Sequence, residues 1–242
     1  MKHDHPGGAA HPKPKASATL SGKLTKLGIR GDAELVLHLP LRYEDETRLT
    51  PLGEIHDAPP GEPVQVEVEV MSTEVAFRPR RQLVSRVRDA HHGDGMLVVR
   101  LLNFYPSQQK QYEPGARLRL FGEVREGYFG LEMVHPRAVA VGDDTPLPTA
   151  LTPVYPTTAG LSQTALRRLI ERALQRVELV DTLPARILAA QQLMPFADAI
   201  RMLHQPPAAL SAEALEARNH AAWRRIRFNE LLAQQLSLRR AY

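Results

Sequence analysis

The sequence has 242 residues and no cysteine, and its 31 lysines and arginines slightly outnumber its 27 aspartates and glutamates. This length exceeds the usual size of one domain, about 100 to 150 residues, and predicts two compact units or one unit with extensions. The absence of cysteine excludes disulfides, thiolate nucleophiles and cysteine zinc sites, and it fits a reducing cytoplasm. Because the sequence contains no run of about 18 apolar residues and no signal sequence, we expect a cytoplasmic protein without a membrane segment. The basic excess is small, but the sequence pI of about 9.5 and the clusters of arginine described below favour an anionic partner.

Residues 1–17 contain His, Pro, Gly and Lys and almost no large apolar side chain, which predicts a disordered tail. His3, His5 and His11 lack a packed scaffold and a carboxylate shell, so we assign them no metal.

Residues 18–60 are predicted to form a helical hairpin and a linker. Leucines recur at helical spacing at Leu20, Leu24 and Leu27. Gly28 ends this helix, and Asp32 is a suitable N-cap for a second helix that ends before Pro40. The glycine-bounded turn between them resembles the link of a helix-hairpin-helix, whose backbone amides hold a DNA phosphate; a purely structural hairpin explains it equally well.

The linker carries three consecutive carboxylates, Glu44, Asp45 and Glu46. Consecutive side chains point in different directions, and the sequence offers no histidine or third ligand nearby. We therefore expect a solvated or salt-bridged turn rather than a metal site or an acid pair.

Residues 61–142 carry the strand signals. Apolar and polar residues alternate from Val64, and four further segments of strand length follow, with a polar insert at 106–114 between the third and fourth strands. The last strand is expected to run from Tyr128 to Val141. Five short strands with this spacing match an oligonucleotide-binding (OB) fold, a Greek-key β-barrel. Its interior is predicted to contain Val64, Val66, Val68, Val70, Leu97, Val99 and Leu101.

The outward face of the predicted barrel combines arginines with aromatic rings. Its arginines are Arg86, Arg88, Arg100, Arg117 and Arg119, opposed only in part by Glu67 and Glu69. Guanidinium groups neutralise phosphates, and flat rings stack on unpaired bases with little regard to sequence. A loop with Arg78, Arg80 and Arg81 is a candidate phosphate clamp, and its alternative is a solubilising turn. The pattern favours nucleic acid, although an ordinary solvated face is the commoner fate of any single strand of this kind.

Residues 143–242 begin with a Pro-rich crossing and continue as helices. The prolines from Pro146 to Pro156 exclude a helix interior and mark a boundary. Ser162 is predicted to cap an amphipathic helix, shorter helices are expected at 185–193 and 196–203, and a final helix from about Ser211 to Arg240. The predicted fold class is α+β, a five-stranded OB-fold flanked by an N-terminal helical hairpin and a C-terminal helical segment.

Several ordered segments resemble the amino-terminal region of RecG, a family of bacterial branch-migrating DNA helicases. They are LPLRYEDET at 39–47, GEVREGYFGLEMVHPR at 122–137, LTPVYPTTAGLSQTALRRLI at 151–170, LHQPP at 203–207 and RFNELLAQQLSLRR at 227–240. The resemblance covers nearly everything after residue 18. It implies that residues 61–142 are a wedge domain that binds branched DNA at stalled replication forks and Holliday junctions, in DNA repair and recombination.

The resemblance implies an ATP-dependent motor, but this sequence contains no G-x-x-x-x-G-K-[ST] phosphate loop. In RecG-like proteins the helicase domains follow the region that corresponds to residues 227–240. We therefore expect the chain alone to be no enzyme and to hold no cofactor, and we expect ATP and Mg²⁺ only at the missing motor. The implied partners are branched DNA, the motor domains in cis and single-strand DNA-binding protein.

RecG-like sequences often have an aromatic residue before the Asn of the third strand, where it stacks on a base at the fork. Here Leu101 and Leu102 precede Asn103. Either Phe104 or Tyr105 supplies the stacking ring, or Leu102 acts as an apolar wedge. The alternative for Phe104 is a core residue at the end of the barrel.

The two alternatives to DNA binding are an enzyme and a protein-interaction scaffold. A single-domain enzyme is disfavoured because no catalytic or metal-ligating constellation stands out in the sequence. A non-enzymatic interaction scaffold built on the OB-fold would use the barrel and the apolar face of the last helix to bind protein partners.

Overall fold

The computed structural model describes residues 19–59, 61–77, 80–92, 95–128, 130–142 and 144–241, so the predicted tail lies outside the described residues. The chain divides into two compact units. The first unit combines Met1–His38 with Pro156–Val177, and the second combines Leu39–Tyr155 with Glu178–Tyr242.

The first unit contains three helices, α1 (Leu20–Lys26), α2 (Asp32–Val36) and α4 (Gln163–Arg176). The hydroxyl of Ser162 accepts a hydrogen bond from the amide of Ala165 at 3.2 Å, which confirms the predicted cap of α4. The predicted cap of α2 is wrong by one residue, because Gly31 is the N-cap and Asp32 is the first helical residue. A carboxylate at that position still favours the helix dipole, and it also pairs with Arg176 at 2.8 Å.

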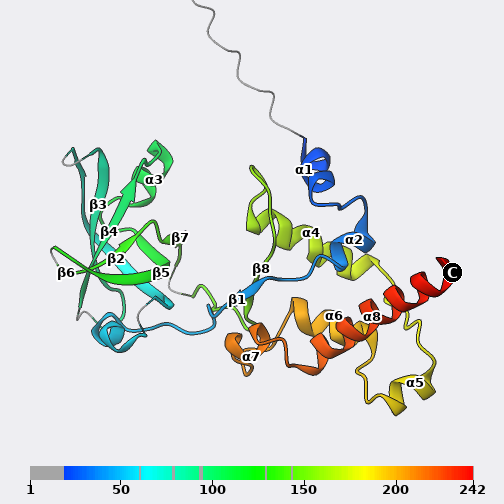
Figure 1. The fold of residues 1–242 in the computed structure, drawn as a ribbon. Coiled ribbons are helices and arrows are strands. Elements are labelled where there is room, and N and C mark those ends of the chain that lie inside the picture. Colours follow the sequence, from blue (N-terminus) through cyan, green and yellow to red (C-terminus); the bar gives the residue numbers. More distant parts are fainter. Residues whose placement is uncertain are drawn as a thin grey trace, which may run out of the picture. The chain divides into compact units, whose positions relative to one another are not determined.

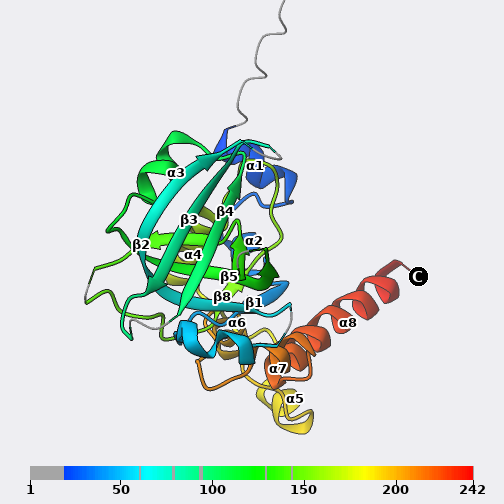
Figure 2. The same ribbon diagram turned by 90° about the vertical axis from the view of Figure 1, so that its left-hand side faces the viewer.

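Five strands of the second unit form a closed barrel. They are β2 (Pro63–Ala76), β3 (Gln82–Asp89), β4 (Met96–Leu102), β5 (Arg117–Gly127) and β6 (Gly130–Val134). The order β2-β3-β4-β6-β5 closes because β5 also pairs with β2. β4 and β6 run parallel, and the other pairs in this ring run antiparallel. Figure 2 shows β2, β3 and β4 as neighbours in one wall of the barrel. The fold is the predicted five-stranded OB-fold with flanking helices, in the α+β class.

One local prediction within the barrel needs correction, and the polar insert contains a further element. The strand expected from Tyr128 to Val141 is broken into β6 and β7 (Arg137–Ala140), and β7 pairs with the other edge of β5. The break falls at His135, which has a φ of 52°, and at Pro136, which has no amide hydrogen for a ladder. The polar insert after β4 contains a short helix, α3 (Pro106–Gln111), with a proline in its first turn.

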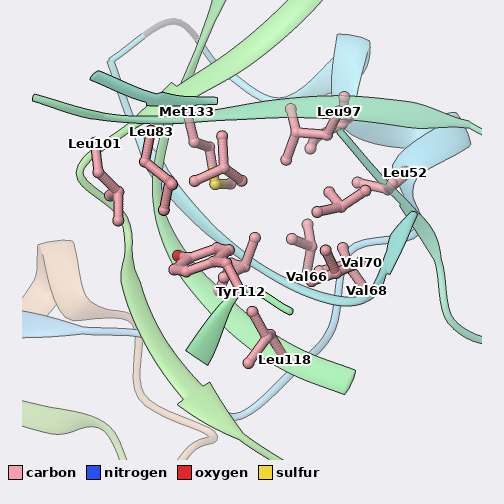
Figure 3. Close-up of a cluster of buried hydrophobic side chains, with 14 of the residues drawn as sticks. Leu52, Val66, Val68, Val70, Leu83, Leu97, Leu101, Tyr112, Leu118 and Met133 are labelled. Atoms are coloured by element: carbon pink, nitrogen blue, oxygen red, sulfur yellow. The ribbon is translucent and has the colours of Figure 1, made fainter. Parts of the chain in front are cut away.

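The barrel interior is filled by the residues that the alternation of β2 and β4 predicts. Val66, Val68, Val70, Leu97, Val99 and Leu101 are each at most 2% exposed, whereas the predicted Val64 is only partly buried and packs against this core. Leu83, Leu118, Tyr112 and Met133 belong to the same cluster (Figure 3). Leu52, in the 3₁₀ helix η1 (Leu52–Asp57), packs against it from outside the five strands. The core therefore draws on every strand of the barrel.

The rest of the second unit is a small sheet and four helices. β1 (Arg42–Glu44) pairs with β8 (Thr152–Val154), and the helices are α5 (Ala185–Ala190), α6 (Phe196–His204), α7 (Ala212–Glu216) and α8 (Ala221–Ala241) (Figure 1). The long helix predicted from Ser211 is thus two helices, and the break contains Arg218 with a φ of 55°. None of the described helices is both long and apolar enough to cross a membrane.

Candidate nucleic-acid interface

One end of the barrel brings together residues from β2, β3 and β4. Ala76 pairs with Gln82, and Gln82 pairs with Leu102, so these three residues form the last row of that wall. One residue beyond this row stand Phe77, Arg81 and Asn103. We call the set Phe77, Arg80, Arg81 and Leu102–Tyr105 the barrel end.

Phe104 is held inside the barrel end by a sharp turn of the backbone. Asn103 has a φ of 56°, a left-handed conformation that Asn tolerates better than most residues, and the chain returns to the core after it. Phe104 is 5% exposed and belongs to the core cluster. The guanidinium carbon of Arg81 lies 4.2 Å from the centroid of the Phe104 ring, within cation–π range. Of the two roles left open for Phe104, the structure therefore shows the core role.

Tyr105 and Leu102 present more surface than Phe104. Tyr105 is 71% exposed, and its amide donates to the side chain of Gln108 at 2.9 Å, which fixes the start of α3. Leu102 is half-buried, and its amide donates to the ring nitrogen Nε2 of His135 at 3.1 Å. Tyr105 is thus the ring of the predicted pair that a base could reach without a change in the core.

The five strand arginines of the candidate site all carry carboxylate partners. The pairs are Arg86–Glu74 at 3.8 Å, Arg88–Glu69 at 2.7 Å, Arg100–Glu132 at 2.5 Å, Arg117–Glu67 at 3.2 Å and Arg119–Glu67 at 3.1 Å. The expectation that carboxylates oppose this set only in part is therefore wrong. The sequence alone does not identify Glu74 and Glu132 as partners, because the strand register is needed to show that they face these arginines.

Two of these carboxylates are buried and organise the arginines around them. Burial alone raises the pKa of Glu132, but hydrogen bonds and charge from Arg100 and Arg125 lower it below its ordinary value. Glu67 receives Arg117 and Arg119, and Arg119 also donates to the carbonyl oxygens of Thr145 and Pro146. Arg100, Arg117 and Arg119 are largely enclosed by these partners, so they bring little net charge to a phosphate.

Arg80 and Arg81 differ from the strand arginines. Both are exposed, and neither has a carboxylate within ion-pair distance among the residues that the structure describes. Arg78, the third member of the predicted clamp, lies outside the described residues. Positive charge that carboxylates do not neutralise is therefore found at the barrel end.

Phe77 is a residue of the barrel end that was not predicted from the sequence. It is 71% exposed and stands directly after the last residue of β2. The available signal was an aromatic residue at the end of a strand, next to the arginine loop.

The acidic linker is salt-bridged, which is one of the two arrangements predicted for it, a solvated or a salt-bridged turn. Arg137 pairs with Glu44 at 2.9 Å and with Glu46 at 2.7 Å, and Asp45 pairs with Arg48 at 3.1 Å. Within the described ranges, no group of three or more histidines and carboxylates is arranged to hold a metal ion.

Comparisons with known proteins agree with this architecture. Residues 17–177 match the family model described as the RecG wedge domain. The chain is 40% identical to the ATP-dependent DNA helicase RecG of Escherichia coli (strain K12) over 226 residues, which cover 91% of the chain and 32% of that protein. It is 38% identical to RecG of Pasteurella multocida and 27% identical to RecG of Thermotoga maritima, over 92% and 90% of the chain and 32% and 27% of those proteins.

A solved structure is similar to the chain as well. It is a structure of RecG bound to a three-way DNA junction, with a TM-score of 0.59 and 26% identity over 81% of this chain and 26% of that one. The chain spans about a third of the length of the curated relatives it matches. The family model covers most of the chain, and it includes the whole barrel. The chain belongs to the RecG wedge domain family.

Proposed function

We propose that this chain is the branched-DNA-binding region of a RecG-like ATP-dependent DNA helicase. It binds replication forks and Holliday junctions in repair and recombination, and a motor encoded in cis supplies ATP hydrolysis with Mg²⁺. The proposal is supported by relatives that are RecG helicases and by the similarity to RecG bound to a three-way junction. Single-strand DNA-binding protein is a further proposed partner.

The observation that carries the proposal is the chemistry of the barrel end. Arg80 and Arg81 are exposed without carboxylate partners among the described residues, and the exposed ring of Tyr105 lies at the same end. Phosphates attract the two guanidinium groups, and an unpaired base offers a face to the ring. Stacking is interrupted at a branch point, so the bases there are unpaired or open more readily than those of an intact duplex. This end therefore favours branched DNA.

The direct test is an equilibrium titration of the chain with a fork, a three-way junction, a duplex and a single strand of matched length. We expect the branched DNAs to bind more tightly than the duplex, and all affinities to fall steeply with salt. Equal affinity for fork and duplex would contradict the proposal. DNA-stimulated ATP hydrolysis by the purified chain would contradict the assignment of that activity to a separate motor.

The contribution of charge is tested with an Arg80→Ala, Arg81→Ala double variant. If both side chains contact phosphates, the slope of log affinity against log salt concentration should fall by up to about 0.9 per lost contact. A matched control is Arg86→Ala with Arg88→Ala, which removes the same charge from arginines that already pair with Glu74 and Glu69. An unchanged slope in the first variant, or an equal drop in both, would refute the role of Arg80 and Arg81.

A protein-interaction role is favoured by one observation on α8. Leu231, Leu236 and Leu238 are exposed on its second half. Such side chains suit contact with other protein, and in a RecG-like protein the motor domains in cis are the natural candidate. This contact is compatible with DNA binding at the barrel end.

A further inference from the structure

Folding does not explain why the aromatic side chain of Phe77 is exposed. A buried phenylalanine stabilises a protein by about 1.5–3 kcal/mol relative to an exposed one. Phe77 nevertheless leaves 71% of its surface in solvent, and it is the one phenylalanine in the described part of the chain that is classed as exposed. Single exposed apolar residues are common, so the position of this ring decides its meaning.

The strand register places Phe77 beside Arg81. Val75 pairs with Leu83, and both side chains pack in or against the barrel core. Because side chains alternate along a strand, counting two residues outward from each places Phe77 and Arg81 on that same face, one row beyond the core. The contact of Arg81 with the ring of Phe104 agrees with this placement.

Asn103 stands on the other side of Arg81 in this row, and Tyr105 follows it by two residues at the start of α3. The wall runs from β2 through β3 to β4, so Phe77 lies at the β2 side of the barrel end and Tyr105 follows β4. Neighbouring strands are about 4.8 Å apart, which puts Phe77 and Asn103, the outer positions of this row, roughly 10 Å from each other. The barrel end therefore carries two exposed rings, Phe77 and Tyr105, together with an arginine that has no carboxylate partner in the described ranges.

We propose that Phe77 is a second stacking site of the barrel end, besides Tyr105, and takes an unpaired nucleobase next to Arg81. The inference rests on the proposed function, because it assigns a further residue to the same interface. A phenyl ring has no hydrogen-bonding group, so it accepts any base by its flat face and adds affinity without sequence preference. Arg81, beside Phe77, is placed to hold the phosphate of a strand whose base Phe77 accepts.

The test compares Phe77→Ala, Phe77→Leu and Phe77→Trp on a fork, a single strand and a duplex. Each unpaired position carries 2-aminopurine, whose fluorescence is quenched when it stacks. Loss of one stacked base should weaken fork and single-strand binding about 5- to 150-fold and should leave duplex binding nearly unchanged. Phe77→Leu should behave like Phe77→Ala, because it is apolar without a ring, whereas Phe77→Trp should keep the affinity and the quenching.

Met96→Ala is the matched control. Met96 is also exposed and lies on the same wall, at the opposite end of β4, roughly 20 Å from Leu102. It should bind all three DNAs like the unmodified chain, and melting curves should show that every variant is folded.

Three results would overturn the inference. They are unchanged binding of fork and single strand by Phe77→Ala, full rescue by Phe77→Leu, and an equal loss of duplex binding. An unmodified chain that shows no preference for the fork would defeat the proposed function instead. In that case the single-strand titrations with the Phe77 variants still decide whether this ring stacks on a base.

Discussion

Arg225 is the most completely buried charged residue in the described part of the chain, and its removal is a sharp test of how α8 is held. It is 0% exposed. Its guanidinium group donates to both carboxylate oxygens of Asp181, at 2.6 and 2.9 Å, and to the carbonyl oxygen of Met194 at 3.0 Å. It also donates to the side chain of Asn229 at 3.1 Å. One side chain thus joins α8 to the segments before and after α5.

We expect Arg225→Met to cost about 3 kcal/mol of stability at neutral pH. Breaking a buried ion pair by removing one partner typically costs about 3–5 kcal/mol. The lower end applies here because the side chain of Asp181 is 24% exposed and keeps hydrogen bonds from the amides of Leu183 and Phe196. Methionine is shorter than arginine but similar in volume and apolar, so the variant removes charge and hydrogen bonds more than volume.

The same pair predicts a dependence on pH. Hydrogen bonds from Arg225 lower the pKa of Asp181 from 3.8 to about 2, against a smaller opposing effect of burial. That difference corresponds to at most about 2.4 kcal/mol, and solvent screening of a partly exposed carboxylate reduces it to about 1–2 kcal/mol. Because the folded pKa is lowered, this stability is present above pH 3.8 and is lost as the pH falls toward 2. Arg225→Met should therefore cost about 1–2 kcal/mol less in acid than at pH 7.

The assay is urea unfolding followed by tryptophan fluorescence. Trp223 is the single tryptophan of the chain and is buried two residues from Arg225, so its emission reports on this packing. The measurement is made at pH 7 and at the lowest pH at which the chain stays folded. A double-mutant cycle with Asp181→Asn isolates the coupling of the pair. Equal costs of Arg225→Met at both pH values, together with zero coupling, would refute this reasoning.

Three further substitutions test the barrel. Phe104→Ala should lower stability by about 3–5 kcal/mol, measured by chemical unfolding, and should weaken binding to all DNA shapes alike, because the ring is core; a fully stable variant with a selective loss of fork binding would restore its stacking role. Gly95→Ala should cost about 1–3 kcal/mol, since Gly95 has a φ of +95° and an added Cβ would lie 2.7 Å from the Cβ of Leu52. Gly61→Ala is its control, with a similar φ and no atom within 4 Å, so it should show the smaller, purely backbone cost. Asp89→Ala should cost about 1–3 kcal/mol because it leaves the amide of Leu52 without its acceptor. Burial raises the pKa of Asp89, but amide hydrogen bonds lower it overall, so this cost should shrink as the pH falls below 3.8 and stay constant if the carboxylate is irrelevant.

Much of the fold follows from local patterns in the sequence. The alternation of valines in β2 placed Val66, Val68 and Val70 in the core, and Ser162 marked the start of α4. These features depend on neighbours along the chain. The breaks after β6 and α7 were missed, because each depends on one or two residues in unusual backbone conformations, at His135 and at Arg218.

The candidate site was harder to predict than the fold. Whether an arginine is available for phosphate depends on the residue opposite to it, and that requires the strand register. Arg100 meets Glu132 only because β4 and β6 run parallel at that point, 32 residues apart in the chain. The roles of neighbouring residues also diverge: the left-handed turn at Asn103 buries Phe104 and leaves Tyr105 exposed. Sequence spacing alone does not show which of the two rings is buried and which is exposed.

The hydrogen bonds of Arg119 have a mechanical consequence. The chain leaves the barrel after β7. This strand is an edge strand added to β5, so it would be the first to separate from the sheet if the chain were pulled. Arg119 donates hydrogen bonds to the carbonyl oxygens of Thr145 and Pro146, in the segment that follows β7. It also donates to the carboxylate of Glu67 in β2. A pull on this segment is therefore transmitted to the wall of the closed barrel rather than to β7 alone. We expect the barrel to move as one body when this segment is pulled, with its core intact.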